Sequence, residues 1–187
     1  MMAAVHTRES LLVTGSIALG AVRELVRQRE GELLRQFPSF LVDSAAALLP
    51  EAVEEQKKLS GFSETVFPLG PGGIFNALWD TCEMYGAGAV IDIKRIPIRQ
   101  ETVEILEYFD LNPYYADSAG ASLLVAEDGA GTAFALQEAG IETAHIGFLT
   151  DGHARTIRYG EHTRYLDRPQ MDELARWENL RLLRERQ

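Results

Sequence analysis

The sequence predicts one α/β domain in which helices cover a β-sheet, and two observations indicate it. Short apolar runs of strand length alternate with segments of helical spacing, in the order strand, two helices, strand, helix, strand, helix, strand, helix, strand pair, helix. The 187 residues are enough for one sizeable core, and no interior linker or repeat divides them. We therefore expect a single domain over residues 1–187, closed by a helix over 170–187.

The first third of the chain predicts a strand and two long helices. Residues 10–15 are a short apolar run that ends at a glycine, which is typical of a buried strand. Helical spacing follows, with Ser16 placed to cap the first turn and Pro38 placed to stop the helix. A second helix is expected over about 40–59, kinked or split at Pro50.

The middle of the chain predicts two further strands, each followed by a helix. Residues 63–69 and 89–93 have the apolar and β-branched character of strands. A Pro/Gly turn leads from the first of them into a helix that Gly86 is suited to end, and a short helix over about 100–109 follows the second. The expected inner face of the helix before Gly86 consists of Ile74, Leu78, Cys82 and Tyr85.

The last third predicts strands over 121–127 and 143–149, separated by a helix that ends at Gly140. A turn then leads into another short strand within 150–160. The charged tail has helical spacing, and we expect its inner face to hold Met171, Leu174, Trp177 or Leu180, and Leu183.

The charge balance and the absence of long apolar runs exclude several classes of protein. The chain carries 28 acidic against 18 basic residues, a formal charge of −10, and a short C-terminal cluster, Arg181, Arg184 and Arg186, is interpreted as the solvated side of a helix. Nucleic acid needs a concentrated basic face, and a membrane span needs about 20 apolar residues in a row. The N-terminus also lacks the pattern of a signal peptide. We expect a cytoplasmic protein that binds neither nucleic acid nor a membrane.

The common catalytic and metal-binding patterns are missing. Gly15 and Gly20 alone stand where a dinucleotide fingerprint needs three glycines. The four histidines lack the spacing of a metal site, and His145 is interpreted as a packed or hydrogen-bonded residue of a strand. The single cysteine, Cys82, lies on an apolar helix face, where it acts as a small hydrophobe. We expect no catalytic residue and no metal site.

One stretch, VFPLGPGGIFNALWD (residues 66–80), has the backbone chemistry of an anion site. Its glycine turn stands before a helix, where free N–H groups and the helix dipole favour a phosphate. A second small-residue turn precedes the strand at 121–127 and adds a hydroxyl. Such turns also occur for steric reasons alone, and this alternative stays open. The candidate phosphate-binding residues are Gly70, Gly72, Gly73, Asn76, Ser118 and Gly120.

The stretch from GPGG (70–73) to LLVAED (123–128) resembles the C-terminal domain of the aminoimidazole ribonucleotide (AIR) synthetase superfamily. Within that superfamily it is similar to AIR-synthase-related proteins and to HypE-like hydrogenase maturation factors. The resemblance covers about residues 11–169 and implies a three-layer α/β/α domain with a mixed sheet flanked by helices. It rests on an ordered set of motifs: the Gly-Gly turn into an apolar helix, Gly86-x-Gly88, an Ile-Asp strand, IPI before a short acidic helix, Asn112-Pro113-Tyr114, and Ser118-x-Gly120.

The resemblance also implies a function. Family members are ATP-using enzymes of two domains, and the N-terminal domain carries the Mg·ATP ligands and forms the dimer. This chain resembles the second domain, and its turn lacks the side chains of the Asp-Pro-Thr-Arg-Gly-Gly turn in the maturation factor, as well as that factor's C-terminal cysteine. We therefore expect a binding or assembly module that is not catalytic alone and that forms a homodimer through apolar surface. The alternative is half of a split ATP-dependent enzyme, in which a separate ATP-binding domain protein brings ATP and Mg²⁺ to the turn.

Overall fold

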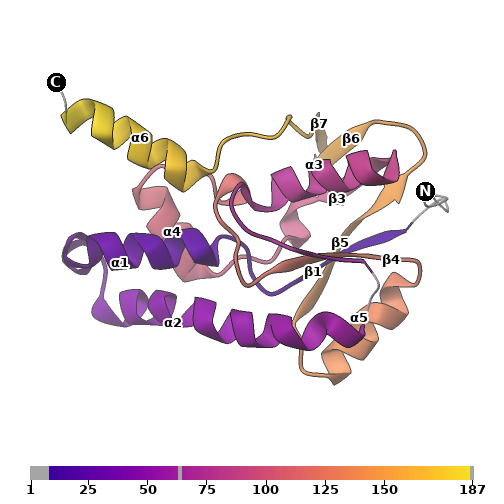
Figure 1. Cartoon of the computed structure of the whole chain (residues 1–187), viewed down its shortest axis with the longest axis horizontal. Coiled ribbons are helices and arrows are strands. Elements are labelled where there is room, and N and C mark those ends of the chain that lie inside the picture. The colour runs from indigo at the N-terminus through magenta and orange to yellow at the C-terminus, as the bar shows by residue number, and fades with distance from the viewer. Residues whose placement is uncertain (1–8, 63–64, 186–187) are drawn as a thin grey trace.

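The chain folds around one mixed sheet of seven strands (Figure 1). The structure is a computed structural model that describes residues 9–62 and 65–185. The strands lie in the order β2-β4-β1-β5-β3-β6-β7, and neighbouring strands are antiparallel except for the parallel pair β3 and β6. Their bounds are β1 Ser10–Thr14, β2 Val66–Pro68, β3 Gly88–Asp92, β4 Ser122–Ala126, β5 Thr143–Thr150, β6 Arg155–Tyr159 and β7 His162–Tyr165.

Helices flank the sheet, with α3 on one side and α2 and α5 on the other, while α1 lies beside the sheet and packs against α2 and α4 (Figure 1). The prediction of an α/β fold with a mixed sheet between helices is therefore confirmed. The α-helices are α1 Leu19–Gln36, α2 Ser39–Gln56, α3 Gly73–Tyr85, α4 Gln100–Tyr108, α5 Gly129–Glu138 and α6 Glu173–Glu185. Three short 3₁₀ helices are η1 Lys57–Gly61, η2 Ile93–Arg95 and η3 Pro113–Tyr115.

The two faces of the sheet carry separate hydrophobic cores, because successive side chains of a strand point to opposite faces. Leu11 and Val13 of β1 belong to the core that α3 closes with Leu78. Leu12, between them, belongs to a smaller core that α5 closes with Leu136. A third cluster joins α1, α2 and α4. The sheet and α3 together position the glycine turn, which lies between β2 and α3.

The start of α1 differs from the prediction. Ser16 does not cap the helix, which begins at Leu19 with Ala18 in the cap position at a left-handed φ of 64°. The N–H of Ala18 donates to the hydroxyl of Ser118 at 2.9 Å. In the first turn the N–H of Ala21 donates to the oxygen of Asp117 at 3.1 Å. The predicted cap is wrong because this distant acceptor replaces a local one, and local spacing carries no signal of it.

The predicted interruption of the second helix at Pro50 is also wrong, since α2 is one continuous helix from Ser39 to Gln56. Pro50 is exposed, so water can satisfy the carbonyl that the proline leaves without a donor. The break in helical geometry lies in α1, where Arg29 has φ −129° and ψ 19°.

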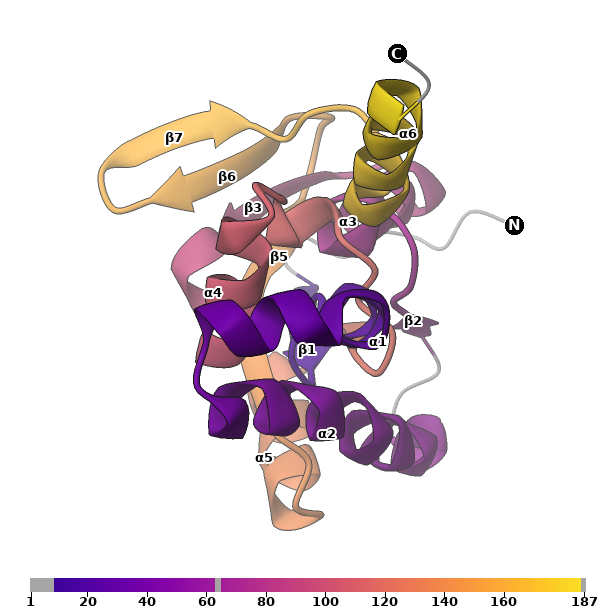
Figure 2. The same cartoon turned by 90° about the vertical axis from the view of Figure 1, so that its left-hand side faces the viewer.

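The tail forms the predicted helix, but its inner face is smaller than expected. Leu174 and Trp177 pack against the cluster of α1, α2 and α4. The rest of the expected face is exposed, because α6 extends away from the body beyond its first turns (Figure 2). The inner-face prediction is therefore wrong for Met171 and Leu183, and of the two alternatives Trp177 and Leu180 it is Trp177 that packs inward.

Strand β7 was not predicted. Its four residues are all exposed and show no apolar alternation, so they carry no strand signal in the sequence. They pair with β6 in a hairpin that projects from the end of the sheet (Figure 2).

Cys82 and His145 lie as predicted. Cys82 is buried on α3, and burial raises the pKa of its thiol to about 11, so that the thiol stays protonated at neutral pH. His145 is half-buried in β5, where burial and then the charge of Arg95 lower its pKa.

Candidate functional site

The glycine turn and the Ser118 turn meet at one carbonyl. The oxygen of Gly70 accepts the N–H of Gly73 at 3.1 Å and the N–H of Ser118 at 3.1 Å. The N–H of Leu69 donates to the oxygen of Ala121 at 2.9 Å, which joins the same two segments once more. The fold therefore brings together two turns that lie about a quarter of the chain apart in the sequence.

Gly72 and Gly73 both have left-handed backbones, with φ of +83° and +65°. A Cβ on Gly73 would lie 2.5 Å from the oxygen of Tyr114 and 2.8 Å from that of Ala116, both of them backbone atoms. Gly70 has no such restriction, because a Cβ there would meet nothing within 4 Å. The steric explanation of the turn thus applies in full to Gly73.

The N–H of Gly72 already has an anionic partner within the chain. It donates to Oδ2 of Asp172 at 2.9 Å. The other carboxylate oxygen, Oδ1, accepts the N–H groups of Leu174 at 2.9 Å and Ala175 at 3.2 Å in the first turn of α6. One carboxylate therefore caps the N-termini of α3 and α6 together, in the place where a phosphate was expected.

Asn76 is engaged by the same part of the chain. Its amide donates to the oxygen of Gln170 at 2.8 Å and accepts the N–H of Gln170 at 3.0 Å. We call residues 170–173 the covering segment, because they lie over the glycine turn. Sequence reasoning missed this segment, which meets the turn only through contacts about 100 residues apart.

Glu173 fixes the covering segment to the body of the protein. It is buried, accepts the N–H of Asn112 at 3.1 Å and forms an ion pair with Arg176 at 2.7 Å. Burial alone would raise the pKa of Glu173, but the hydrogen bonds from Arg176 and Asn112 and the charge of Arg176 lower the pKa overall. The segment is thus held at Gln170, Asp172 and Glu173.

Ser118 and Gly120 have structural partners. The Ser118 hydroxyl is buried, accepts the N–H of Ala18 and donates to the oxygen of Ala116 at 2.9 Å. Gly120 has φ +92°, and a Cβ there would lie 2.9 Å from Cβ of Ala52 on α2. The candidate residues Gly70, Gly72, Gly73, Asn76 and Ser118 therefore gather at one place, whereas Gly120 faces α2.

Asp117 is a second carboxylate at this place, and sequence reasoning missed it. It is half-buried, Oδ1 accepts the N–H of Ala119 at 3.0 Å, and the absence of a Cβ on Gly20 leaves room for its carboxylate. Burial raises the pKa of Asp117, the hydrogen bond from Ala119 opposes that rise, and the charge of Asp172 adds to it. The two carboxylates make this place unfavourable for another anion. Asp117 could have been noticed in the sequence, because it stands directly before the Ser-x-Gly turn.

Replacing Asp117 with asparagine should stabilise the protein at pH 7. The substitution keeps an acceptor for Ala119 and removes a charge whose burial is costly. A carboxyl with a raised pKa in the folded chain binds its proton more tightly when folded, so its ionisation destabilises the fold at higher pH. The gain should shrink as the pH falls through the raised pKa towards about 3.9, the ordinary value of an aspartate.

Urea unfolding at a series of pH values measures this effect. Asp43→Asn on α2 removes the same charge from an exposed position and serves as the control. An equal gain in both variants, or a gain in Asp117→Asn that grows at low pH, would contradict the prediction.

The described residues form neither a cluster of metal ligands nor a membrane-spanning helix. Within residues 9–62 and 65–185, no group of three or more His, Cys, Asp or Glu side chains is placed to hold a metal ion. None of the helices described in these ranges is long and apolar enough to cross a membrane.

The fold is similar to solved structures of the hydrogenase maturation protein HypE and of a thiamine-monophosphate kinase. E. coli HypE, described as a hydrogenase maturation protein, is 17% identical, with 93% of this chain and 53% of HypE covered at a TM-score of 0.66. A HypE in complex with ATP gives 17% identity, coverage of 91% and 53%, and a TM-score of 0.66. Thiamine-monophosphate kinase from Stenotrophomonas maltophilia K279a gives 14% identity, coverage of 81% and 50%, and a TM-score of 0.57.

These similarities show the fold. The chain spans about half the length of the solved structures it matches. No protein-family model matches the sequence, and a search of curated proteins found no match. The α/β fold with a mixed sheet between helices, which the resemblance implied, is therefore shared with HypE and thiamine-monophosphate kinase.

Proposed function

We propose that this chain is a binding or assembly module with an AIR-synthase C-terminal-like fold, related to hydrogenase maturation proteins and not catalytic alone. The observation that carries the proposal is the covering segment. Asp172 accepts a hydrogen bond from the N–H of Gly72, and the backbone of Gln170 forms two hydrogen bonds with the side-chain amide of Asn76. The groups that would hold a phosphate are therefore engaged within the chain.

The charge at the turn supports the same proposal. Asp117 and Asp172 interact electrostatically beside the N-terminus of α3. A carboxylate at a helix N-terminus satisfies the positive end of the helix dipole, as a phosphate would. A phosphate must displace Asp172 before it can reach the N–H of Gly72, and it then meets the charge of Asp117.

A solved complex of HypE with HypF supports a role in assembly, and 88% of this chain and 54% of its matched chain are covered at a TM-score of 0.63. We propose a protein partner for this module, a cytoplasmic location and a homodimer.

The apolar surface that we propose for self-association is the outer part of α6, where Leu180, Leu182 and Leu183 are exposed. Sedimentation at micromolar concentration should give twice the mass of the chain, and the mass of one chain would contradict the homodimer.

The second candidate is half of a split ATP-dependent enzyme, in which a separate ATP-binding domain displaces the covering segment and supplies ATP and Mg²⁺. The observation that favours it is the backbone of the turn. Gly72 and Gly73 keep left-handed conformations at the N-terminus of α3, whose thirteen residues begin at Gly73. This geometry suits a phosphate once the covering segment moves.

A calorimetric titration with ATP, ADP, AMP, aminoimidazole ribonucleotide and phosphate, with and without Mg²⁺, separates the two candidates. Gly70→Glu places a carboxylate at the turn in open space, and Gln137→Glu makes the same charge change on exposed α5. If the module proposal holds, Gly70→Glu leaves every titration as in the wild type. A saturable component that Gly70→Glu abolishes and Gln137→Glu preserves would overturn it in favour of the split enzyme.

A further inference from the structure

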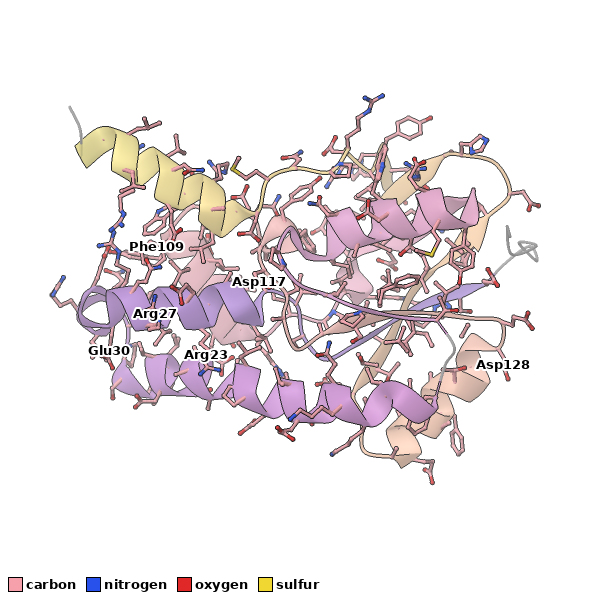
Figure 3. All side chains as sticks on the ribbon, in the orientation of Figure 1. Arg23, Arg27, Glu30, Phe109, Asp117 and Asp128 are labelled. Atoms are coloured by element: carbon pink, nitrogen blue, oxygen red, sulfur yellow. The ribbon has the colours of Figure 1, made fainter. Side chains whose placement is uncertain are left out.

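A cavity of about 300 Å³ lies where α6 crosses the break in α1 and the end of α4. Figure 3 labels Phe109, which lies between α6 and α1 at this place. The cavity is separate from the glycine turn, because its α6 residues begin at Arg176, beyond the covering segment. The side chains that matter are Phe109, Trp177 and four arginines, Arg29, Arg176, Arg181 and Arg184.

The cavity lining is rich in positive charge, opposite in sign to the net charge of the chain. Four guanidinium groups line it and Asp110 is the acidic residue of its lining, whereas the whole chain has a formal charge of −10. Glu173 offsets the charge of Arg176 at 2.7 Å, and like charges gathered at one place otherwise repel each other. The interpretation of the C-terminal arginines as a solvated face therefore needs correction for Arg181, which is half-buried and lies over the Trp177 ring, 5.7 Å from its centre.

Arg29 lines the cavity at the position where the backbone of α1 leaves helical geometry. Its φ of −129° and ψ of 19° interrupt α1, and its guanidinium lies over the Trp177 ring at 5.2 Å. The nearest carboxylate oxygen, on Glu32, is 3.7 Å from Nη1, which is too far for a hydrogen bond. Nε of Arg29 is buried and has no hydrogen-bond partner in the structure. A buried donor of a charged group is thus left for a ligand to satisfy.

Phe109 and Trp177 form an aromatic wall of the cavity. Phe109 meets Trp177 edge to face, with ring centres 5.4 Å apart. Arg29 and Arg181 both lie over the Trp177 ring within cation–π distance, which places their two guanidinium groups around one aromatic side chain. Because these two guanidinium groups already use the Trp177 ring, the cavity suits a compact anion better than a ligand that must stack a base there.

We propose that this arginine cavity binds a compact phosphate-type polyanion, with two linked phosphates as its best match. Guanidinium forks match phosphate oxygens with paired, charge-assisted hydrogen bonds, and several of them favour a ligand with several charges. The volume is at the lower end of small-molecule sites, which fits such a group. The inference does not depend on the proposed function, since it uses none of the residues of the glycine turn.

The test is a calorimetric titration of the full chain with inorganic pyrophosphate at low salt, compared with orthophosphate and with citrate as a carboxylate polyanion. Pyrophosphate should bind with a stoichiometry of one and more tightly than either of the others, and added salt should weaken the binding. No saturable binding of pyrophosphate, or tighter binding of citrate, would overturn the proposal.

Arginine variants test whether pyrophosphate binds in the arginine cavity. Arg29→Gln and Arg184→Gln should each weaken pyrophosphate binding by about tenfold, the effect of losing one hydrogen-bonded charge. Arg184 is exposed, so its replacement leaves the fold intact even if Arg29→Gln disturbs α1. The control is Arg23→Gln with Arg27→Gln, two exposed arginines of the same helix that do not line the cavity (Figure 3).

The outcomes separate this site from the glycine turn. Binding that survives in Gly70→Glu and in the Arg23, Arg27 control but weakens in Arg184→Gln supports the arginine cavity. Equal weakening in the control and in Arg184→Gln would show a general charge effect and overturn the proposal. Loss in Gly70→Glu alone would also overturn it, and would assign the phosphate to the turn.

Discussion

Replacing Gly73 with alanine should lower the free energy of unfolding by about 3 kcal/mol, from a strained left-handed backbone and an overpacked contact. The Cβ would lie 2.5 Å from the oxygen of Tyr114 and 2.8 Å from that of Ala116. Both are backbone atoms of the loop that contacts α3, so no side chain can turn away. Urea unfolding with far-UV circular dichroism measures the loss.

Substitutions at two other glycines separate the two causes of this loss of stability, the backbone strain and the overpacked contact. Gly86 ends the same helix with φ +61°, but a Cβ there would meet nothing within 4 Å. Gly86→Ala should therefore cost only the backbone strain, about 1 kcal/mol. Gly70→Ala, with open space and no left-handed backbone, should be close to neutral. Equal losses in Gly73→Ala and Gly86→Ala would contradict the close contact with the Tyr114 loop.

Asp172→Ala should have the second large effect, a loss of about 2 kcal/mol, because a helix cap and a charged hydrogen bond disappear together. The carboxylate accepts the N–H groups of Gly72, Leu174 and Ala175. Its removal leaves the covering segment attached beside the turn by the hydrogen bonds between Gln170 and Asn76, and frees the N–H of Gly72. Amide hydrogen exchange should speed up at Gly72 as well as in the first turn of α6, alongside the shift in the urea midpoint.

Asp128→Ala is the matched control for Asp172→Ala. Asp128, labelled in Figure 3, caps α5 alone through the N–H of Gly131 at 2.9 Å. Its loss should cost about 1 kcal/mol, the usual value of one cap, and should leave exchange at Gly72 unchanged. If Asp172→Ala costs no more than Asp128→Ala and Gly72 exchanges at the wild-type rate, Asp172 does not join the two helices.

The sequence was informative where short-range patterns decide the structure. The strand at Ser10–Thr14 and the face of Ile74, Leu78 and Cys82 follow from apolar spacing, and the structure buries these three side chains. Gly86 was also placed correctly, since a left-handed residue after α3 is a local requirement. β7 escaped detection because all four of its residues are exposed.

The candidate site was only partly accessible from the sequence. The glycine turn and Ser118 were both predicted from their residue types as parts of one phosphate site, and the N–H groups of Gly73 and Ser118 donate to the same oxygen, that of Gly70. The partners that decide the chemistry of the turn could not be found, because Asp172 reaches Gly72 across 100 residues. A cap residue such as Asp172 has an obvious local role in starting α6, which hides its second role at α3.

The arginine cavity was missed for a similar reason. Helical spacing predicts that Arg181 and Arg184 share a polar face, and it carries no information about what that face meets. The break of α1 at Arg29 brings a third arginine to the same place, although no proline or glycine occupies that position. Only tertiary structure places these charges together.

The most direct test of the central claim is an NMR titration of the wild-type chain with Mg·ATP, followed at the amides of Gly72 and Gly73. The claim is that Asp172 closes the turn within the isolated chain, so that the turn is not open to a nucleotide. It predicts slow hydrogen exchange at Gly72 and no saturable shift of either amide, whatever shifts occur near Arg29 and Arg181. A saturable shift of both amides, absent in Gly70→Glu, would contradict the claim and assign the turn to nucleotide binding.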